Sequence, residues 1–150
     1  MKIEIRHSIL GVRYSIYIFT PMFLYKLIDL FFVIFHTSLI IFNVFGWIWK
    51  KTRKANLIIL SLTAASWFIL GIFYGIGYCP LTDWHFNVLY KLGKYNLPNS
   101  YTKYLADRLT GFDFNPNLVD RVVLLVFLVA LFISLLLNFK GLTLKLFRKF

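Results

Sequence analysis

The densest group of side chains that could do chemistry lies in residues 77–85, where Cys79, Asp83 and His85 fall close together. A thiol, a carboxylate and an imidazole can together ligate a metal ion, or can act as nucleophile, acid and base. The spacing matches no established metal-ligand pattern, and a fourth ligand is not evident. A structural interpretation stays open beside the chemical one, in which Asp83 stabilises a helix N-terminus, Trp84 anchors that helix and Cys79 is a small buried residue.

His36 is the fourth candidate, because it lies well inside the apolar stretch of residues 27–49. An ionisable side chain within a membrane is a functional hypothesis by default, and here it would be a buried proton carrier. The alternative is that the imidazole links neighbouring helices by a hydrogen bond to Asn43, Ser61, Thr63 or Ser134. Haem held by two histidines would need a second imidazole at similar depth, and neither His7 nor His85 lies in a span. No metal and no cofactor is predicted.

Three polar residues of this stretch, Asp29, His36 and Asn43, follow one another at intervals of seven. Seven residues are almost two turns of an α-helix, so the three side chains fall on one face and form an intramembrane polar seam. Asn43 must face the helix bundle, because lipid cannot satisfy its amide group. Asp29 lies near the outer end, where it is expected to be interfacial and to pair with Lys26 or reach water.

The composition is that of an integral membrane protein. The chain of 150 residues is 59% hydrophobic and only 15% charged, and its mean hydropathy is +0.71. The net charge of +11 comes from cations at the ends of apolar stretches, where they meet lipid headgroups. We therefore expect membrane lipids as partners, and no nucleic acid. The single cysteine excludes a disulfide within the chain.

Three stretches are long enough to cross the roughly 30 Å hydrocarbon core of a bilayer at ~1.5 Å per residue. They cover residues 27–49, 57–78 and 118–138 of one membrane domain, residues 25–139. The predicted fold class is thus an all-α integral membrane bundle with three transmembrane helices. Asn117 is expected to cap the third of them.

Residues 1–24 are predicted to be an N-terminal interfacial segment or an extension that precedes a start at Met22. Residues 9–24 are apolar enough to touch a membrane, but Arg13 lies within them and Pro21 near their end. The energetic cost of arginine in a bilayer argues against a fourth span.

The cations predict which ends of the spans share a side of the membrane. They gather in the loop of residues 50–56 and in the basic tail of residues 140–150. By the positive-inside rule both segments face the cytoplasm, and residues 79–117 face outward.

The outer loop is predicted to hold two short amphipathic helices that cover the mouth of the bundle. The first starts at Thr82 and ends at Gly93, and one face of it carries Trp84, Val88, Leu89 and Leu92. The second starts at Asn99 or Ser100 and ends at Gly111, with Tyr101, Tyr104, Leu105 and Leu109 on one side. Trp84 and Tyr101, with Trp49 in the first span, are the expected anchors at the membrane interface.

The second span carries four residues at intervals of four, namely Thr63, Trp67, Gly71 and Gly75. They share one helix face, and the GxxxG spacing of the two glycines favours close approach of a partner backbone. These residues are therefore expected to pack against another helix.

Several sequence motifs together resemble one bacterial membrane protein family. They are FHTSLIIFN around His36, Gly46-Trp47, the basic KTRKAN loop, Trp67, CPLTDWH at 79–85 and NSY at 99–101. The chain is similar, over about residues 22–139, to domain of unknown function two-seven-eight-four, in its Bacteroidetes branch. The resemblance implies a small helical bundle in the bacterial inner membrane, with residues 79–117 in the periplasm and no known activity. It also implies that His36, Asn43, Cys79 and Trp84 form the family's signature.

Two functions remain open. The first is a non-enzymatic inner-membrane protein, either an accessory subunit with another membrane protein as its partner, or a binding module for a lipid or quinone-like molecule. The second is a small membrane enzyme or a redox or metal site at the outer face. In that case Cys79 would be nucleophile or ligand, Asp83 and His85 would be acid and base or ligands, and His36 would carry protons.

Overall fold

A computed structural model describes the backbone of residues 3–147 and the side chains of residues 22–140. All regular structure in that part of the chain is helical. The elements are α1 (Ile3–Phe45), α2 (Arg53–Ala65), the π-helical η1 (Ser66–Leu70), α3 (Gly71–Tyr74), α4 (Pro80–Lys91), α5 (Tyr101–Thr110) and α6 (Pro116–Phe147).

Three helical segments are long and apolar enough to cross a membrane, namely Met22–Phe45, Arg53–Tyr74 and Pro116–Lys140. The second of them is built from α2, η1 and α3 in succession. The chain is therefore an all-α, multi-pass membrane protein, as its composition predicts. Helices α4 and α5 lie in the connection between the second and third segments, where two short helices are expected.

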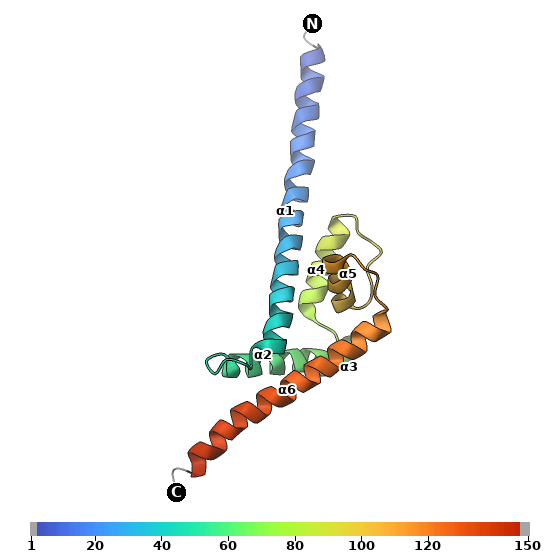
Figure 1. Cartoon of the computed structure of the whole chain (residues 1–150). Coiled ribbons are helices and arrows are strands. Elements are labelled where there is room, and N and C mark those ends of the chain that lie inside the picture. The colour runs from blue at the N-terminus through green and yellow to red at the C-terminus, as the bar shows by residue number, and fades with distance from the viewer. Residues whose placement is uncertain (1–2, 148–150) are drawn as a thin grey trace.

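The N-terminal segment is not separated from the first span. Helix α1 runs without a break from Ile3 to Phe45 and includes Pro21, the residue expected to lie near the end of a separate segment. In Figure 1 the N-terminal half of α1 extends away from the other helices. The interfacial position of residues 1–24 stays a prediction, and the side chains of residues 1–21 lie outside the described part of the structure.

The second span ends four residues earlier than predicted, at Tyr74. Gly75 and Gly77 have φ angles of 103° and 89°, a region that glycine enters without steric cost. The turn that they form folds back on η1, where the Ser66 hydroxyl donates to the Tyr78 carbonyl at 2.8 Å.

The GxxxG pair serves this turn rather than helix packing, in contrast to the prediction. Gly75 lies beyond the helix, and a Cβ atom built on Gly71 would meet the Cα atom of Ile76 at 3.2 Å. The other two residues of the row do contact other helices. The Trp67 ring packs on Phe127 of α6 with 4.8 Å between centroids, and Thr63 accepts a hydrogen bond from Asn43 of α1 at 3.2 Å.

Helix α4 begins earlier than predicted and buries a different face. Pro80 occupies its first turn after Cys79 at the N-cap, so Thr82 lies inside the helix rather than at its start. His85 and Leu89 are fully buried, whereas Trp84 is 60% exposed. The predicted end is confirmed, because Gly93 has a φ angle of 79°.

Helix α5 has the predicted boundaries. The Ser100 side chain accepts a hydrogen bond from the Lys103 amide at 3.3 Å, and Gly111 closes the helix in the left-handed conformation. Leu109 is exposed instead of sharing the buried face of Tyr101 and Tyr104.

The start of α6 differs from the prediction by two residues. The side chain of Asn115, not that of Asn117, accepts hydrogen bonds from the amides of Asn117 and Leu118, at 3.0 and 3.3 Å. Pro116 then takes the first helical position, where its missing amide hydrogen costs nothing.

Figure 1 shows how the helices are arranged. Helices α4 and α5 lie beside the middle of α1, α2 runs across the lower end of α1, and α6 passes diagonally below. Two separate apolar cores result. One joins α1, α4 and α5 through Val33, Leu89, Tyr101, Tyr104 and Leu105, and the other joins α2 and α6 through Leu60, Phe127 and Ala130.

Asn56 connects α1, α2 and α6 at the second core. Its fully buried amide nitrogen donates to the carbonyls of Phe42 and Asn43 at 2.7 and 3.3 Å, and its oxygen accepts from Ser134 at 2.9 Å. The absence of a side chain at Gly46 permits this approach, because a Cβ atom there would lie 2.8 Å from the Asn56 amide nitrogen.

We predict that Asn56→Ala destabilises the protein by about 1–3 kcal/mol, because it leaves the Ser134 hydroxyl and the α1 carbonyls buried without their partner. Unfolding in mixed micelles, followed by far-UV circular dichroism, measures the effect. The control is Ser61→Ala on the same helix, where the exposed hydroxyl bonds only the Leu57 carbonyl. Equal stability of the two variants would contradict the assigned role.

Candidate functional site

A buried carboxylate joins three helices beside the apolar core that α1 shares with α4 and α5. Asp29 of α1 is 6% exposed and receives two hydrogen bonds from the Arg108 guanidinium of α5, Nη1 to Oδ1 at 2.5 Å and Nη2 to Oδ2 at 2.8 Å. The Nε2 atom of His85, from α4, lies 2.8 Å from the same Oδ1. Arginine and carboxylate in this two-point geometry form one of the stronger polar contacts in proteins.

The surroundings of His85 fix its protonation. Burial lowers the pKa of His85, so the imidazole is neutral at pH 7, although the Asp29 carboxylate opposes the shift. Since a carboxylate accepts, Nε2 carries the hydrogen. The Nδ1 atom then accepts from the Tyr101 hydroxyl, which lies 2.6 Å away. The ring also stacks on Phe32 with 5.0 Å between centroids.

Two tyrosines of α5 complete the network. Burial raises the pKa of Tyr101 and also that of Tyr104, so both phenols stay protonated. Arg108 Nη1 donates to the Tyr104 hydroxyl at 2.5 Å in addition to its bonds with Asp29. Asp29, His85 and Tyr101 thus form one hydrogen-bonded series across α1, α4 and α5. The arrangement therefore holds α4 and α5 on α1.

His36 lies next to this network without joining it. The residue is 4% exposed, and its ring centroid is 4.4 Å from that of Tyr101. Neither ring nitrogen has a hydrogen-bond partner among the described residues; the Phe32 carbonyl one turn earlier is near but outside bonding geometry. The side-chain amide oxygen of Asn43, Oδ1, seven residues on, is also buried without a partner among the described residues. The polar seam thus has bonding capacity left in its middle.

The structure divides the sequence cluster at residues 79–85. His85 points into the core, whereas Asp83 is exposed and raises the pKa of Tyr78 through hydrogen bonding with its hydroxyl. Cys79 is half-buried at the N-cap of α4. Among the residues that the structure describes, no three His, Cys, Asp or Glu side chains are grouped so that they could hold a metal ion.

Four other predicted positions remain. Trp49 is 61% exposed and Trp84 is exposed too, and their place at the membrane interface stays a prediction. Tyr101 is buried in the core shared by α1, α4 and α5 and is bonded to His85, so it is not an interface anchor. Asp29 pairs with Arg108 and His85 instead of with Lys26 or water.

Sequence reasoning missed Arg108 and Asn56, and it named Tyr104 and Ser134 without the partners that they have in the structure. A usable signal existed for Arg108, because an aspartate inside an apolar helix needs a cation and Arg108 lies one turn after Tyr104 on the face predicted to be buried. For Asn56 and Ser134 the signal was weaker, since single polar residues near span ends also reach water.

The family model described as "Protein of Unknown function (DUF2784)" matches residues 26–139, well over half of the chain, and the chain therefore belongs to this family. The assignment to a Bacteroidetes branch stays a prediction. No curated protein and no solved structure matches the chain.

We predict that Arg108→Gln raises the pKa of His85. The guanidinium disfavours the imidazolium, so its removal leaves the Asp29 carboxylate to favour it. Nitrogen chemical shifts of ¹⁵N-labelled histidine, titrated in detergent micelles, report both the tautomer and the titration. Arg121→Gln, which removes an exposed arginine at the start of α6, should leave the titration unchanged. A pKa that stays the same or falls in Arg108→Gln would contradict the arrangement.

Proposed function

We propose that this member of the DUF2784 family is a non-enzymatic protein of the bacterial inner membrane that binds a small amphiphile, a lipid or quinone-like molecule, through His36. The polar seam of α1 would supply the hydrogen bonds, and the aromatic side chains around it the apolar contacts. The protein would act as a binding module or as an accessory to another membrane protein.

The observation that carries this proposal is the state of the His36 imidazole. It lies near the middle of the first span, it is buried, and neither nitrogen has a partner among the described residues. A buried polar group without a hydrogen bond costs about 1–3 kcal/mol, and ionisable groups at membrane depth are usually functional. A ligand atom that bonds the imidazole would recover this energy.

The chemistry around His36 favours a flat molecule with oxygen atoms. A neutral imidazole can donate to a carbonyl and accept from a hydroxyl, so it can bind both an oxidised and a reduced quinone. The rings of Tyr101 and Phe35 lie 4.4 and 6.0 Å from that of His36, centroid to centroid. Aromatic side chains at such distances suit an aromatic ligand.

The alternative function, a small enzyme at the outer face, draws on the hydrogen-bonded chain from Asp29 through His85 to Tyr101. This chain has the order of an acid, a base and a hydroxyl. The raised pKa of Tyr101 makes its phenol a poor nucleophile, and Cys79 is not part of the chain. The geometry therefore supports the binding function better.

The charge distribution supports an orientation with the loop of residues 50–56 and the tail of residues 140–150 in the cytoplasm. Residues 79–117, which include α4 and α5, would then face the periplasm. Asp29 at the outer end of its span and its partners in α4 and α5 would share that side.

We predict that the purified full-length chain in micelles binds a short-chain benzoquinone, measured by isothermal titration calorimetry against empty micelles. His36→Ala should weaken binding by about tenfold or more, equivalent to ~1.4 kcal/mol. His36→Gln, which keeps a donor and an acceptor, should retain part of the affinity, and Ser61→Ala should retain all of it. Undiminished binding by a folded His36→Ala protein would refute the assignment of His36.

The labelling of Cys79, the single cysteine of the chain, tests this orientation. A membrane-impermeant maleimide should label Cys79 in intact cells. In a Cys79→Ser background, Asn87→Cys in α4 should behave in the same way, and Lys51→Cys should react only after permeabilisation. The reverse pattern for these two variants would invert the topology.

A further inference from the structure

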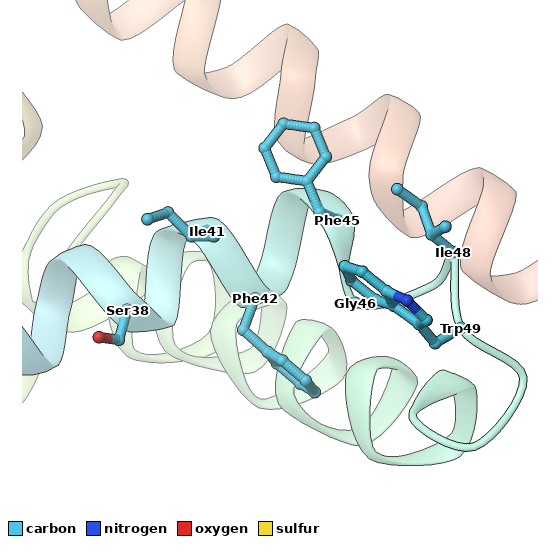
Figure 2. A pocket seen from close by; sticks show the side chains of 7 residues that line it. All are labelled: Ser38, Ile41, Phe42, Phe45, Gly46, Ile48 and Trp49. Carbon is cyan, nitrogen blue, oxygen red and sulfur yellow. The ribbon is translucent and has the colours of Figure 1, made fainter.

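An apolar hollow lies at the end of α1, on the side away from the polar seam. Its volume is about 430 Å³, and Figure 2 shows the side chains that line it, among them Ile41, Phe45, Ile48 and Trp49. At 100° per residue, Ile41 and Phe45 fall on the opposite face of the helix from His36. The volume is within the usual range of small-molecule sites, about 300–1,000 Å³.

A group of cations follows the hollow directly in the chain. Lys50, Lys51 and Lys54 are exposed, and none forms an ion pair with an acidic residue in the described part of the structure. The sequence contains no aspartate or glutamate between Asp29 and Asp83. The positive charge at this end of the molecule therefore has no acidic side chain near it in the sequence.

The start of α2 adds to the positive potential at the same place. The side chain of Thr52 at its N-cap accepts no hydrogen bond from the first-turn amides. The single hydrogen of its hydroxyl is shared between the carbonyls of Gly46 and Trp49, at 2.7 and 3.1 Å. The first turn of α2 also has no acidic residue. No acidic side chain in its first turn therefore compensates the positive end of this helix dipole.

From the apolar hollow and the adjoining uncompensated charge we infer that this end of α1 binds one anionic phospholipid. The headgroup contacts Lys50, Lys51 and Lys54, and an acyl chain lies in the hollow along Phe45, Ile48 and Trp49. A zwitterionic lipid would fill the hollow equally well but would leave the cations without a counter-charge. This site lies on the other face of α1 from His36, so it stands or falls independently of the proposed function.

The test uses the full-length chain reconstituted in phosphatidylcholine vesicles that contain a minor fraction of lipid with brominated acyl chains. Bromine quenches the fluorescence of tryptophan that it contacts, so Trp49 reports on lipid in the hollow. Brominated phosphatidylglycerol should occupy the site about tenfold more than brominated phosphatidylcholine at the same mole fraction. Equal quenching by the two lipids would overturn the proposal.

Three variants locate the effect. Trp49→Phe keeps every charge and should lose the difference between the two lipids; a difference that persists would place the lipid elsewhere and overturn the proposal. Replacement of Lys50, Lys51 and Lys54 by glutamine should abolish the preference, and replacement by arginine should preserve it. The matched control replaces Lys91, Lys94 and Arg121 by glutamine. An equal loss in this control would show only diffuse attraction between the protein and the vesicle, which would also overturn the proposal.

Discussion

The structure depends on one constraint, that the Asp29 carboxylate inside an apolar helix must be paired. Burying a charge without a counter-charge costs several kcal/mol, and an excellent geometry is needed to recover that cost. Arg108 supplies the geometry with two hydrogen bonds, and His85 supplies a third. Because these two residues come from α5 and α4, the requirement of one side chain helps to fix two short helices against α1, beside the apolar core that they share with it.

The polar seam of α1 forms hydrogen bonds with other helices at its two ends and not at its middle. At one end Asp29 bonds α4 and α5, and at the other Asn43 bonds Thr63 of α2 while its carbonyl receives the amide of Asn56. These contacts correspond to the two separate apolar cores. His36 lies between them, where its neighbours are aromatic rings rather than polar atoms.

The features that the sequence predicted well are those set by nearby residues. The spans follow from length and apolar character, and the ends of α5 follow from Ser100 and Gly111. Residues near Asp29 in the sequence did not indicate its partners, because Arg108 is 79 residues distant in the chain. The cluster at residues 79–85 failed for a local reason. Once Pro80 starts a helix, Asp83 and His85 are two positions apart, about 200° around the axis, so one faces out when the other faces the core.

The same geometry explains why His36 and the neighbouring network can serve different purposes. The Tyr101 hydroxyl is engaged with His85, and the tyrosine ring contacts the imidazole of His36 in a tilted arrangement, with 4.4 Å between centroids. A ligand that bonds His36 would therefore compete with no hydrogen bond that holds α4 and α5 in place. If the proposed ligand binds there, its binding and release would leave the pairing of Asp29 with Arg108 and His85 intact.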